Sequence, residues 1–270
     1  MSVVLHFSDP HFGTEQQPVV EALLALARAE RPELAILSGD ITQRARRSQF
    51  RAARSFVDRL EAGATLCIPG NHDIPLFDLL ARLWSPYGHY REAFGDDLEP
   101  VFESSTLLAV GVNTTRQSRH KHGEVSPEQV SRVCALLERA RPEQLRLVVT
   151  HQPVHVVRAS DQVNLLRGYD PAVRAWSQAG ADALLGGHIH LPYVRPLGEG
   201  FAGLPRRTWC VQAGTALSSR VRDGVPNSVN VLRYPDGEPG KVAVERWDFD
   251  AKQARFERGF VDRLELDRPQ

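Results

Sequence analysis

The chain has 270 residues, enough for one large domain or two small ones, and a chain of this length can bury roughly three quarters of its unfolded surface. Its 42% apolar and 24% charged residues are typical of globular proteins and exclude a disordered chain, a collagen and a coiled coil. Basic and acidic residues number 33 each, and this balance argues against a broad binder of nucleic acid or of a membrane surface.

The cysteines and the apolar runs of the sequence indicate the cellular compartment. Cys67, Cys134 and Cys210 form no CxxC pair, which favours buried thiols in a reducing compartment. No apolar run reaches the roughly 18 residues of a membrane span, and the N-terminus lacks the basic and apolar regions of a signal peptide. We therefore expect a cytoplasmic protein. Because no linker or composition break divides the chain, we expect one domain over residues 1–270.

The first third of the chain alternates short apolar runs with amphipathic stretches. Pro18 suits the first turn of a helix, and apolar residues then recur at helical spacing. Strand–helix alternation of this kind implies parallel strands joined by right-handed crossovers. The predicted strands lie at 3–7, 34–37 and 65–68, and the predicted helices at 18–30 and 48–62.

The remainder of the chain is less regular. Residues 74–100 are expected to form an insertion of helix and loop. Ser126, Pro127 and Gln129 have the spacing of a capping box, which predicts the start of a helix. A further helix begins near Asp170 and ends at Gly180, and residues 265–270 are expected to fray. Strands are predicted at 106–112, 145–149, 183–185, 208–211, 228–232 and 242–247, with a turn at 235–237.

Polar residues stand where five of the predicted strands end. In open α/β sheets, ligands bind outside the carboxyl ends of the strands, so these residues are expected at one rim. Leaving Asp73 aside, they amount to two aspartates, one asparagine and five histidines. The five stretches are Ser8-Asp9-Pro10-His11, Gly39-Asp40, Gly70-Asn71-His72-Asp73, Thr150-His151 and Gly187-His188-Ile189-His190.

This set of side chains predicts a metal site. Each motif alone occurs by chance, and a lone histidine at a strand end is more often structural; the conjunction of all five, in order, favours metal binding. Carboxylate, imidazole and amide oxygen suit divalent ions such as Mn, Fe and Zn, and no cysteine joins them. Seven ligands serve two metals if one carboxylate bridges them. Two ions about 4 Å apart can clamp the oxygens of an in-line displacement and hold a bridging hydroxide as nucleophile.

In order and spacing, these motifs resemble the calcineurin-like metallophosphoesterase superfamily over residues 3 to about 215. The stretches Ser38-Gly39-Asp40-Ile41-Thr42-Gln43 and Pro69-Gly70-Asn71-His72-Asp73 are similar to its bacterial class III cyclic nucleotide phosphodiesterase branch. The resemblance implies an α/β fold, an αββα sandwich of two mixed β-sheets flanked by helices, with a dinuclear metal centre.

The resemblance also implies a role for each strand-end residue. His72 has no metal to hold and would face the phosphate, where it stabilises charge or protonates the leaving oxygen. Asp73 either orients His72 through a hydrogen bond or simply caps its loop. The implied ligands are Asp9, His11 and His190 for one metal, Asn71, His151 and His188 for the other, and Asp40 as the bridge.

We therefore expect hydrolysis of a small-molecule phosphodiester, such as a cyclic nucleotide, that depends on two divalent metal ions (Mn, Fe or Zn). A phosphomonoesterase or a nuclease is the alternative, although the neutral charge disfavours nucleic acid. A metal-free scaffold would be expected to have lost some of the seven ligands. The sequence leaves open the oligomeric state, a homo-oligomer included. It also leaves open whether loop 116–123 is a phosphate-attracting lid or a solvated loop, and whether Asn113 faces the pocket or forms a turn.

Overall fold

The structure is a computed structural model that describes residues 1–222, 224–235 and 240–268. Two six-stranded mixed β-sheets lie face to face. The first has the order β12-β11-β10-β1-β2-β3 and the second the order β4-β5-β6-β7-β9-β8. The strands of the first sheet are β1 (Ser2–Phe7), β2 (Leu34–Ser38), β3 (Ala64–Ile68), β10 (Ser228–Tyr234), β11 (Lys241–Asp250) and β12 (Arg255–Glu265). Those of the second are β4 (Val101–Glu103), β5 (Leu107–Gly111), β6 (Leu145–Val149), β7 (Ala183–Gly186), β8 (Tyr193–Pro196) and β9 (Trp209–Gln212).

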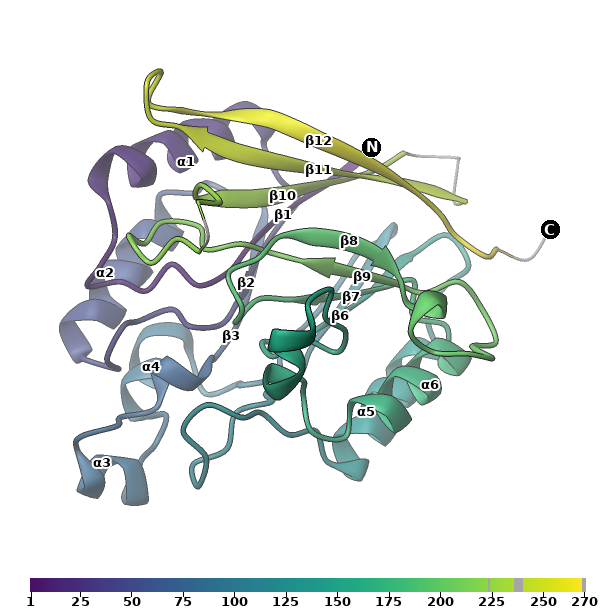
Figure 1. The fold of residues 1–270 in the computed structure, drawn as a ribbon, viewed down its shortest axis with the longest axis horizontal. Coiled ribbons are helices and arrows are strands. Elements are labelled where there is room, and N and C mark those ends of the chain that lie inside the picture. The colour runs from purple at the N-terminus through teal and green to yellow at the C-terminus, as the bar shows by residue number, and fades with distance from the viewer. Residues whose placement is uncertain (223, 236–239, 269–270) are drawn as a thin grey trace.

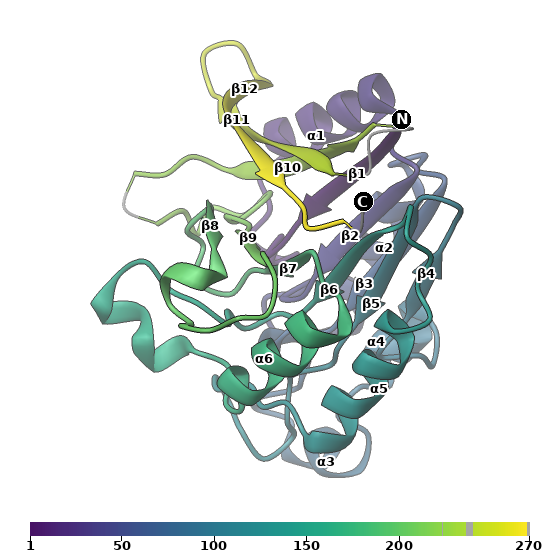
Figure 2. The ribbon, with the colours of Figure 1, turned by 90° about the vertical axis from the view of Figure 1, so that its right-hand side faces the viewer.

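Helices cover the outer faces of both sheets, with α1 and α2 on the first and α5 and α6 on the second (Figures 1 and 2). This arrangement confirms the predicted αββα sandwich. The helices are α1 (Gln17–Glu30), α2 (Arg47–Asp58), α3 (Leu79–Trp84), α4 (Gly88–Phe94), α5 (Pro127–Leu137) and α6 (Tyr169–Ala179). Three short 3₁₀ turns are η1 (Asn71–Asp73), η2 (Ala159–Asn164) and η3 (Leu197–Glu199). No helix within the described residues is long and apolar enough to cross a membrane.

The central strands are apolar on both faces. Successive side chains of a strand point to opposite faces, and here both faces are buried. In β1, Val4 points into the core between the sheets, while Leu5 and Phe7 pack under the helices. In β6, Leu147 faces the same central core and Val148 packs toward α5 and α6. Because both faces are covered, these strands read as continuous apolar runs rather than as alternating ones.

Most elements predicted from the first two thirds of the chain are confirmed. Strands β1, β2 and β3 pair in parallel, as do β5, β6, β7 and β9. The capping box at the start of α5 is present, because Gln129 N–H donates to Ser126 Oγ and Gln129 Oε1 accepts from Ser126 N–H. Residues 74–100 hold the short helices α3 and α4, and Gly180 ends α6 in a left-handed conformation with φ 114°.

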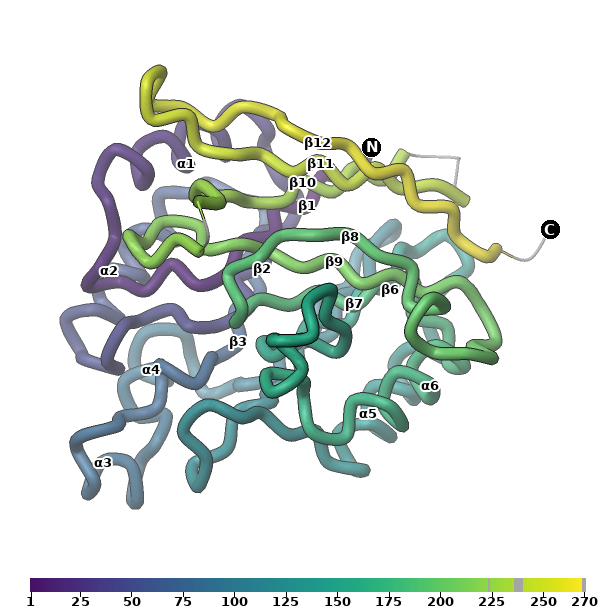
Figure 3. Tube along the Cα trace, in the orientation of Figure 1, coloured from purple at the N-terminus to yellow at the C-terminus, as the bar shows by residue number. Residues whose placement is uncertain are grey.

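The C-terminal part differs from the prediction. The chain returns to the first sheet with β10, β11 and β12, and the whole of β12 had no counterpart among the predicted strands (Figure 3). Residues 266–268, expected to fray, are instead anchored: Leu266 is buried in the central core, and Arg268 forms an ion pair with Asp182. The predicted turn at 235–237 lies largely outside the described residues, as do 269 and 270.

Candidate metal centre

The loops that carry the predicted ligands are joined at the carboxyl ends of β1, β2, β3, β6 and β7. The loops after β1 and β2 lie side by side, because Asp9 N–H donates to the Gly39 carbonyl and His11 N–H to the Asp40 carbonyl, both at 3.1 Å. A link between the two sheets comes from His188 N–H, which donates to Asp9 Oδ2 at 2.8 Å. The rim predicted from strand ends is therefore one connected structure contributed by both sheets.

The backbone of this rim is strained. Five of the seven predicted ligands are non-glycine residues with φ between 45° and 71°, a region that side chains with a Cβ rarely occupy. Such conformations cost about 1–3 kcal/mol each and persist where the surroundings fix them, typically at functional sites. The five residues are Asp9, His11, Asp40, His188 and His190.

Two glycines allow the ligand loops to approach one another. Gly39 has φ 97°, and a Cβ at this position would lie 2.5 Å from His151 Nδ1. A Cβ on Gly70 would lie 2.0 Å from the backbone nitrogen of Asp40. Any larger residue at either position would push the loops apart. The glycines that precede Asp40 and Asn71 are therefore required for the close packing of the ligand loops.

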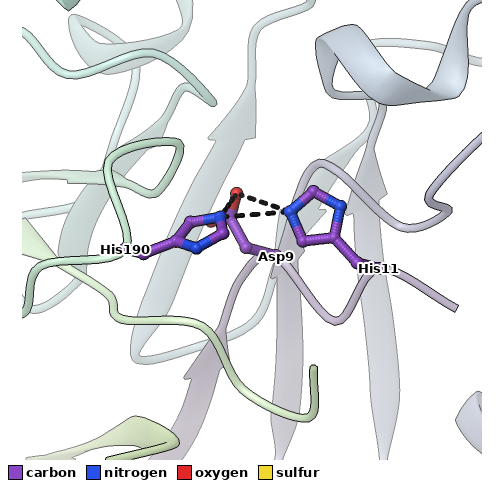
Figure 4. A group of neighbouring side chains, drawn as sticks. All are labelled: Asp9, His11 and His190. Carbon is purple, nitrogen blue, oxygen red and sulfur yellow. Dashed lines mark hydrogen bonds and ion pairs between the residues drawn. The ribbon is translucent and has the colours of Figure 1, made fainter. Parts of the chain in front are cut away.

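The first ligand group consists of Asp9, His11 and His190, shown in Figure 4. Asp9 Oδ1 lies 3.2 Å from His190 Nε2 and 3.8 Å from His11 Nε2, and the two ring nitrogens are 3.1 Å apart. His190 Nδ1 donates to the Arg220 carbonyl at 2.7 Å. Since a carbonyl only accepts, that hydrogen bond fixes the proton on Nδ1 and turns Nε2 toward the group.

The second group consists of Asp40, His151 and His188. His151 Nε2 lies 3.2 Å from Asp40 Oδ1, and His151 Nδ1 donates to the Ser38 carbonyl at 2.8 Å. Asp40 also faces the first group, because its Oδ2 lies 3.8 Å from His11 Nε2. Asp40 thus stands between the two groups, where a shared ligand would have to lie.

Several buried polar atoms of these groups have no hydrogen-bond partner within the described part of the chain. They include Asp9 Oδ1, Asn71 Oδ1 and His151 Nε2. A buried polar atom left without a partner costs about 1–3 kcal/mol, so such atoms are rare unless something else satisfies them. Carboxylate, amide oxygen and imidazole are the donor set of Mn, Fe and Zn. The residues therefore fit a dinuclear metal centre.

The charges of the site favour a cation. Burial opposes ionisation of Asp40, but the imidazoles of His151 and His72 outweigh it and hold the pKa of Asp40 well below its usual range. The same competition, with His190 as the main partner, lowers the pKa of Asp9. Burial lowers the pKa of His11 to about 3 and that of His188 to about 3. Ionised Asp9 and Asp40 beside neutral His11 and His188 are the protonation states that metal ligands need. Against the effect of burial, Asp40 raises the pKa of His151 to about 9 and Asp9 raises the pKa of His190, so a cation bound here must displace a proton from these two imidazoles.

His72 lies beside the ligands rather than among the orphaned atoms. Its Nδ1 donates to the Gln43 carbonyl at 3.0 Å, and its Nε2 lies 4.0 Å from Asp40 Oδ2. Its ring meets that of His11 edge to face, with 4.9 Å between centroids. With 19% of its side chain exposed, His72 can reach a molecule in the pocket while its neighbour Asn71 is buried.

The structure corrects the idea that Asp73 orients His72. The ring of His72 takes its partner from Gln43, whereas the Asp73 carboxylate accepts backbone N–H groups of Ile41, Thr42 and Gly70 at 2.8–3.0 Å. Asp73 therefore joins the loops after β2 and β3, which is the capping alternative. Burial and the charge of Asp40 raise the pKa of Asp73 to about 6, against these three hydrogen bonds.

A pocket of about 750 Å³ opens over the two ligand groups, and His120 and Lys121 of loop 116–123 line it. Asn113 instead forms a turn, since its Oδ1 accepts from Thr115 N–H at 3.1 Å. Other lining residues were not anticipated from the sequence, because they lie outside the strand-end motifs. They are Asp161, Asn164, Arg220, Val221 and Arg222.

Arg220 is the most informative of these additional residues. Its guanidinium donates to Gln43 Oε1 at 2.9 Å and lies 3.4 Å from His72 Nε2, while its carbonyl holds His190. It belongs to the irregular segment after β9, which no motif marks. In the sequence, Arg220 could be noticed only as a basic residue in the region that follows β9, a strand of the second sheet.

The family model of the calcineurin-like phosphoesterases matches residues 2–192. The chain belongs to this family. The family uses a dinuclear metal site for phosphoester hydrolysis, and the two groups around Asp40 are the candidate ligands here. His11, Asp40 and His72 form a third group whose ligand atoms also lie within 4.8 Å of one another. No curated protein matches the sequence of this chain.

Solved structures share the fold at low sequence identity. A dimetal phosphatase from Danio rerio is 12% identical with a TM-score of 0.68, over 98% of this chain and 99% of that one. A purple acid phosphatase from yellow lupin is 13% identical with a TM-score of 0.71, over 96% of this chain and 53% of the lupin chain. Vacuolar Protein Sorting 29 from Cryptosporidium parvum is 10% identical with a TM-score of 0.51, over 98% of both chains. Because these proteins carry different names, the fold alone does not define the substrate.

Proposed function

We propose that this chain is a dinuclear-metal-dependent phosphodiesterase of small molecules, related to the bacterial class III cyclic nucleotide phosphodiesterases. The observation that carries the proposal is the position of Asp40. One of its oxygens lies 3.2 Å from His151 and the other 3.8 Å from His11, so a single carboxylate faces both ligand groups. His72 stands beside it on the side of the pocket.

Each ligand has a proposed place. When bound, two divalent ions supply Lewis acidity toward the phosphate oxygens and a water nucleophile at neutral pH. Mn, Fe or Zn suits the donor set. The proposed ligands are Asp9, His11 and His190 for one ion, Asn71, His151 and His188 for the other, and Asp40 for both.

His72 and Arg220 are proposed to act on the phosphoester. Because Nδ1 of His72 donates to the Gln43 carbonyl, any proton that the ring transfers to a leaving oxygen must be carried on Nε2. Arg220 places a guanidinium 3.4 Å from that nitrogen, close enough to contact the same phosphate. Together, His72 and Arg220 place a proton donor and a positive charge on the side of the metal ligands that faces the pocket.

Two buried residues of the pocket wall favour a substrate whose phosphate carries a polar substituent. Asp161 and Asn164 are buried, with 3% and 9% of their surfaces exposed, and each has a side-chain oxygen without a hydrogen-bond partner among the described residues. Asp161 is also paired with Arg222 at 2.9 Å. Unused acceptors beside a phosphate site suit the hydroxyl or amino groups of a sugar or a base, and therefore a nucleotide-like diester.

A proposed cytoplasmic location has separate support. All three cysteines are free, and Cys67 and Cys210 are buried. Burial raises the pKa of both thiols to about 12, so they behave as inert core groups, which suits a reducing environment.

A substrate panel tests the proposal. The metal-loaded protein is assayed with bis-p-nitrophenyl phosphate, p-nitrophenyl phosphate, cyclic nucleotides and glycerophosphodiesters. We expect kcat/KM for a diester to exceed that for the monoester by about tenfold or more, which is about 1.4 kcal/mol of selectivity. Preference for the monoester would make the protein a phosphomonoesterase. A protein that binds no metal and hydrolyses none of these esters would support the metal-free scaffold instead.

A further inference from the structure

The short helix α3 and Phe77, two residues before it, expose an unusual number of large apolar side chains. Each is between 67% and 82% exposed, and α3 itself lies at the periphery of the molecule, away from both sheets (Figures 1 and 2). Isolated exposed apolar residues are common, but a cluster of this size usually marks an interaction site. The cluster, here called the α3 face, consists of Phe77, Leu79, Leu80, Leu83 and Trp84.

The orientation of α3 is inverted relative to an ordinary surface helix. Its leucines and Trp84 occupy one side, since positions 79, 80, 83 and 84 fall within about 140° at 100° per residue. Arg82 points the other way and donates to the carbonyls of Pro75 at 3.0 Å and Arg119 at 2.8 Å. The helix is therefore held to the protein through its polar side, and its apolar side faces outward.

Basic residues surround the α3 face. The segments 43–47, 74–85 and 115–123 carry seven Lys and Arg residues and one acidic residue, although the whole chain has no net charge. These segments are in contact, because the Arg44 guanidinium lies 5.3 Å from the Phe77 ring centroid and Gln117 donates to the Leu83 carbonyl at 2.9 Å. The charge balance of the sequence thus conceals a local basic surface.

Part of this positive charge is not neutralised by carboxylates. Arg47 pairs with Glu92 and Arg119 with Glu124. Arg44, Arg46 and Lys121 form no ion pair with any residue that the structure describes, and all three are exposed. An anionic surface that approached the α3 face would therefore meet uncompensated positive charge around its edge.

We propose that the α3 face and its basic surroundings dock the protein on an anionic lipid bilayer. Leucines and a tryptophan on one side, bordered by Arg and Lys, have the composition of a helix that lies in the membrane interface. Anionic headgroups complement the unpaired Arg44, Arg46 and Lys121. A twofold contact between two copies through the same face would instead bring two basic rims together. Because Lys121 also lines the pocket, docking would place the pocket beside the lipid surface.

Vesicle sedimentation tests this proposal without reference to activity. The probe is phosphatidylcholine vesicles with or without phosphatidylglycerol, and we expect binding only to the anionic vesicles, weakened by added salt. Leu80→Glu/Trp84→Glu and Arg44→Glu/Arg46→Glu should each lower the bound fraction about tenfold. Phe260→Glu is the matched control, since Phe260 is 60% exposed on β12, away from α3, and should leave binding unchanged.

The outcomes separate docking from the alternatives. Metal content and hydrolysis of the water-soluble bis-p-nitrophenyl phosphate should be unchanged in all three variants, which shows that they fold and that the result is independent of the proposed function. The proposal is overturned if the unmodified protein sediments with neither type of vesicle, or if Phe260→Glu lowers binding as much as the α3 variants. It is also overturned if size-exclusion chromatography shows a dimer that Trp84→Glu separates into monomers, because the face would then join two copies.

Discussion

Asp9 at the metal centre and Trp84 on α3 are opposite departures from the rule that charges lie outside and aromatics inside. Asp9 has no exposed surface, whereas Trp84 leaves 82% of its surface exposed. Each would be costly if the chain acted alone: a buried carboxylate needs a compensating charge, and an exposed indole needs an apolar contact. The two residues thus point to two partners outside the polypeptide, a cation in the first case and a lipid surface in the second.

The two regions also differ in how they are held. The metal centre is joined to both sheets, for example through His188 N–H to Asp9 Oδ2 and His151 Nδ1 to the Ser38 carbonyl. The α3 face is attached mainly through the hydrogen bonds of Arg82 and Gln117. Substitutions at the centre should therefore change chemistry strongly, while those on α3 should change contacts with a partner and little else.

The largest effect is expected for Asp40→Ala. Because Asp40 faces both ligand groups, its loss should weaken both metals and lower kcat by orders of magnitude. Asp58→Ala is the control, since Asp58 is exposed and pairs with Arg54 in the same helix. If Asp40→Ala keeps more than about a tenth of the activity, which corresponds to about 1.4 kcal/mol of barrier, the shared-ligand assignment is wrong.

His72→Ala should lower kcat by about 10²–10⁴ while leaving the metal content near normal, because His72 contacts the pocket and not the orphaned ligand atoms. The loss should shrink for esters with a good leaving group if His72 donates the proton. It should stay constant across leaving groups if His72 stabilises charge on the phosphoryl oxygens. A His72→Ala protein that purifies without metal would move this residue into the ligand set.

Arg220→Ala should have a smaller effect, about tenfold in kcat/KM, because one charge-assisted contact to the phosphate is lost while the carbonyl that holds His190 remains. Arg174→Ala, an exposed arginine on α6, provides the comparison. Steady-state kinetics with a diester would measure both. Unchanged kcat/KM in Arg220→Ala would remove this residue from the phosphate site.

The smallest effect is expected for the stability of Trp84→Ala. Trp176 is fully buried between α6 and the second sheet, so Trp176→Ala should cost about 3–5 kcal/mol of unfolding free energy. Trp84 is largely exposed, so its removal should change stability by no more than about 0.5 kcal/mol. Urea unfolding of both variants measures the difference. Similar costs would mean that Trp84 contributes to folding rather than to docking.

Much of the fold could be predicted because local patterns and tertiary structure agree in the parallel strands. Strands such as β1 and β6 are apolar on both faces since helices cover one side and the other sheet covers the second. The edge strand β12 escaped prediction because six successive residues, 258–263, are exposed and half of them are charged, so no apolar run marks it. How the strands divide between two sheets is a matter of pairing over long distances, and only the family resemblance indicated it.

In the site, too, the residues next to strand ends could be predicted, whereas those from distant irregular segments could not. Asp9, Asp40 and His151 could be found because each follows a buried strand directly, and parallel strands bring their carboxyl ends together. Arg220 and Asp161 could not, since they reach the pocket from irregular segments whose course depends on the rest of the fold. The role of Asp73 could not be chosen from spacing alone, because its partners Ile41 and Thr42 come from another loop.

The metal content of the purified protein tests the central claim, two ions held by two groups around Asp40, most directly. Elemental analysis of the metal-loaded chain should give two equivalents. His190→Ala and His151→Ala should each lose about one equivalent, because each removes a ligand from a different group. A single equivalent in the unmodified protein, or two equivalents retained in both variants, would contradict the dinuclear centre described above.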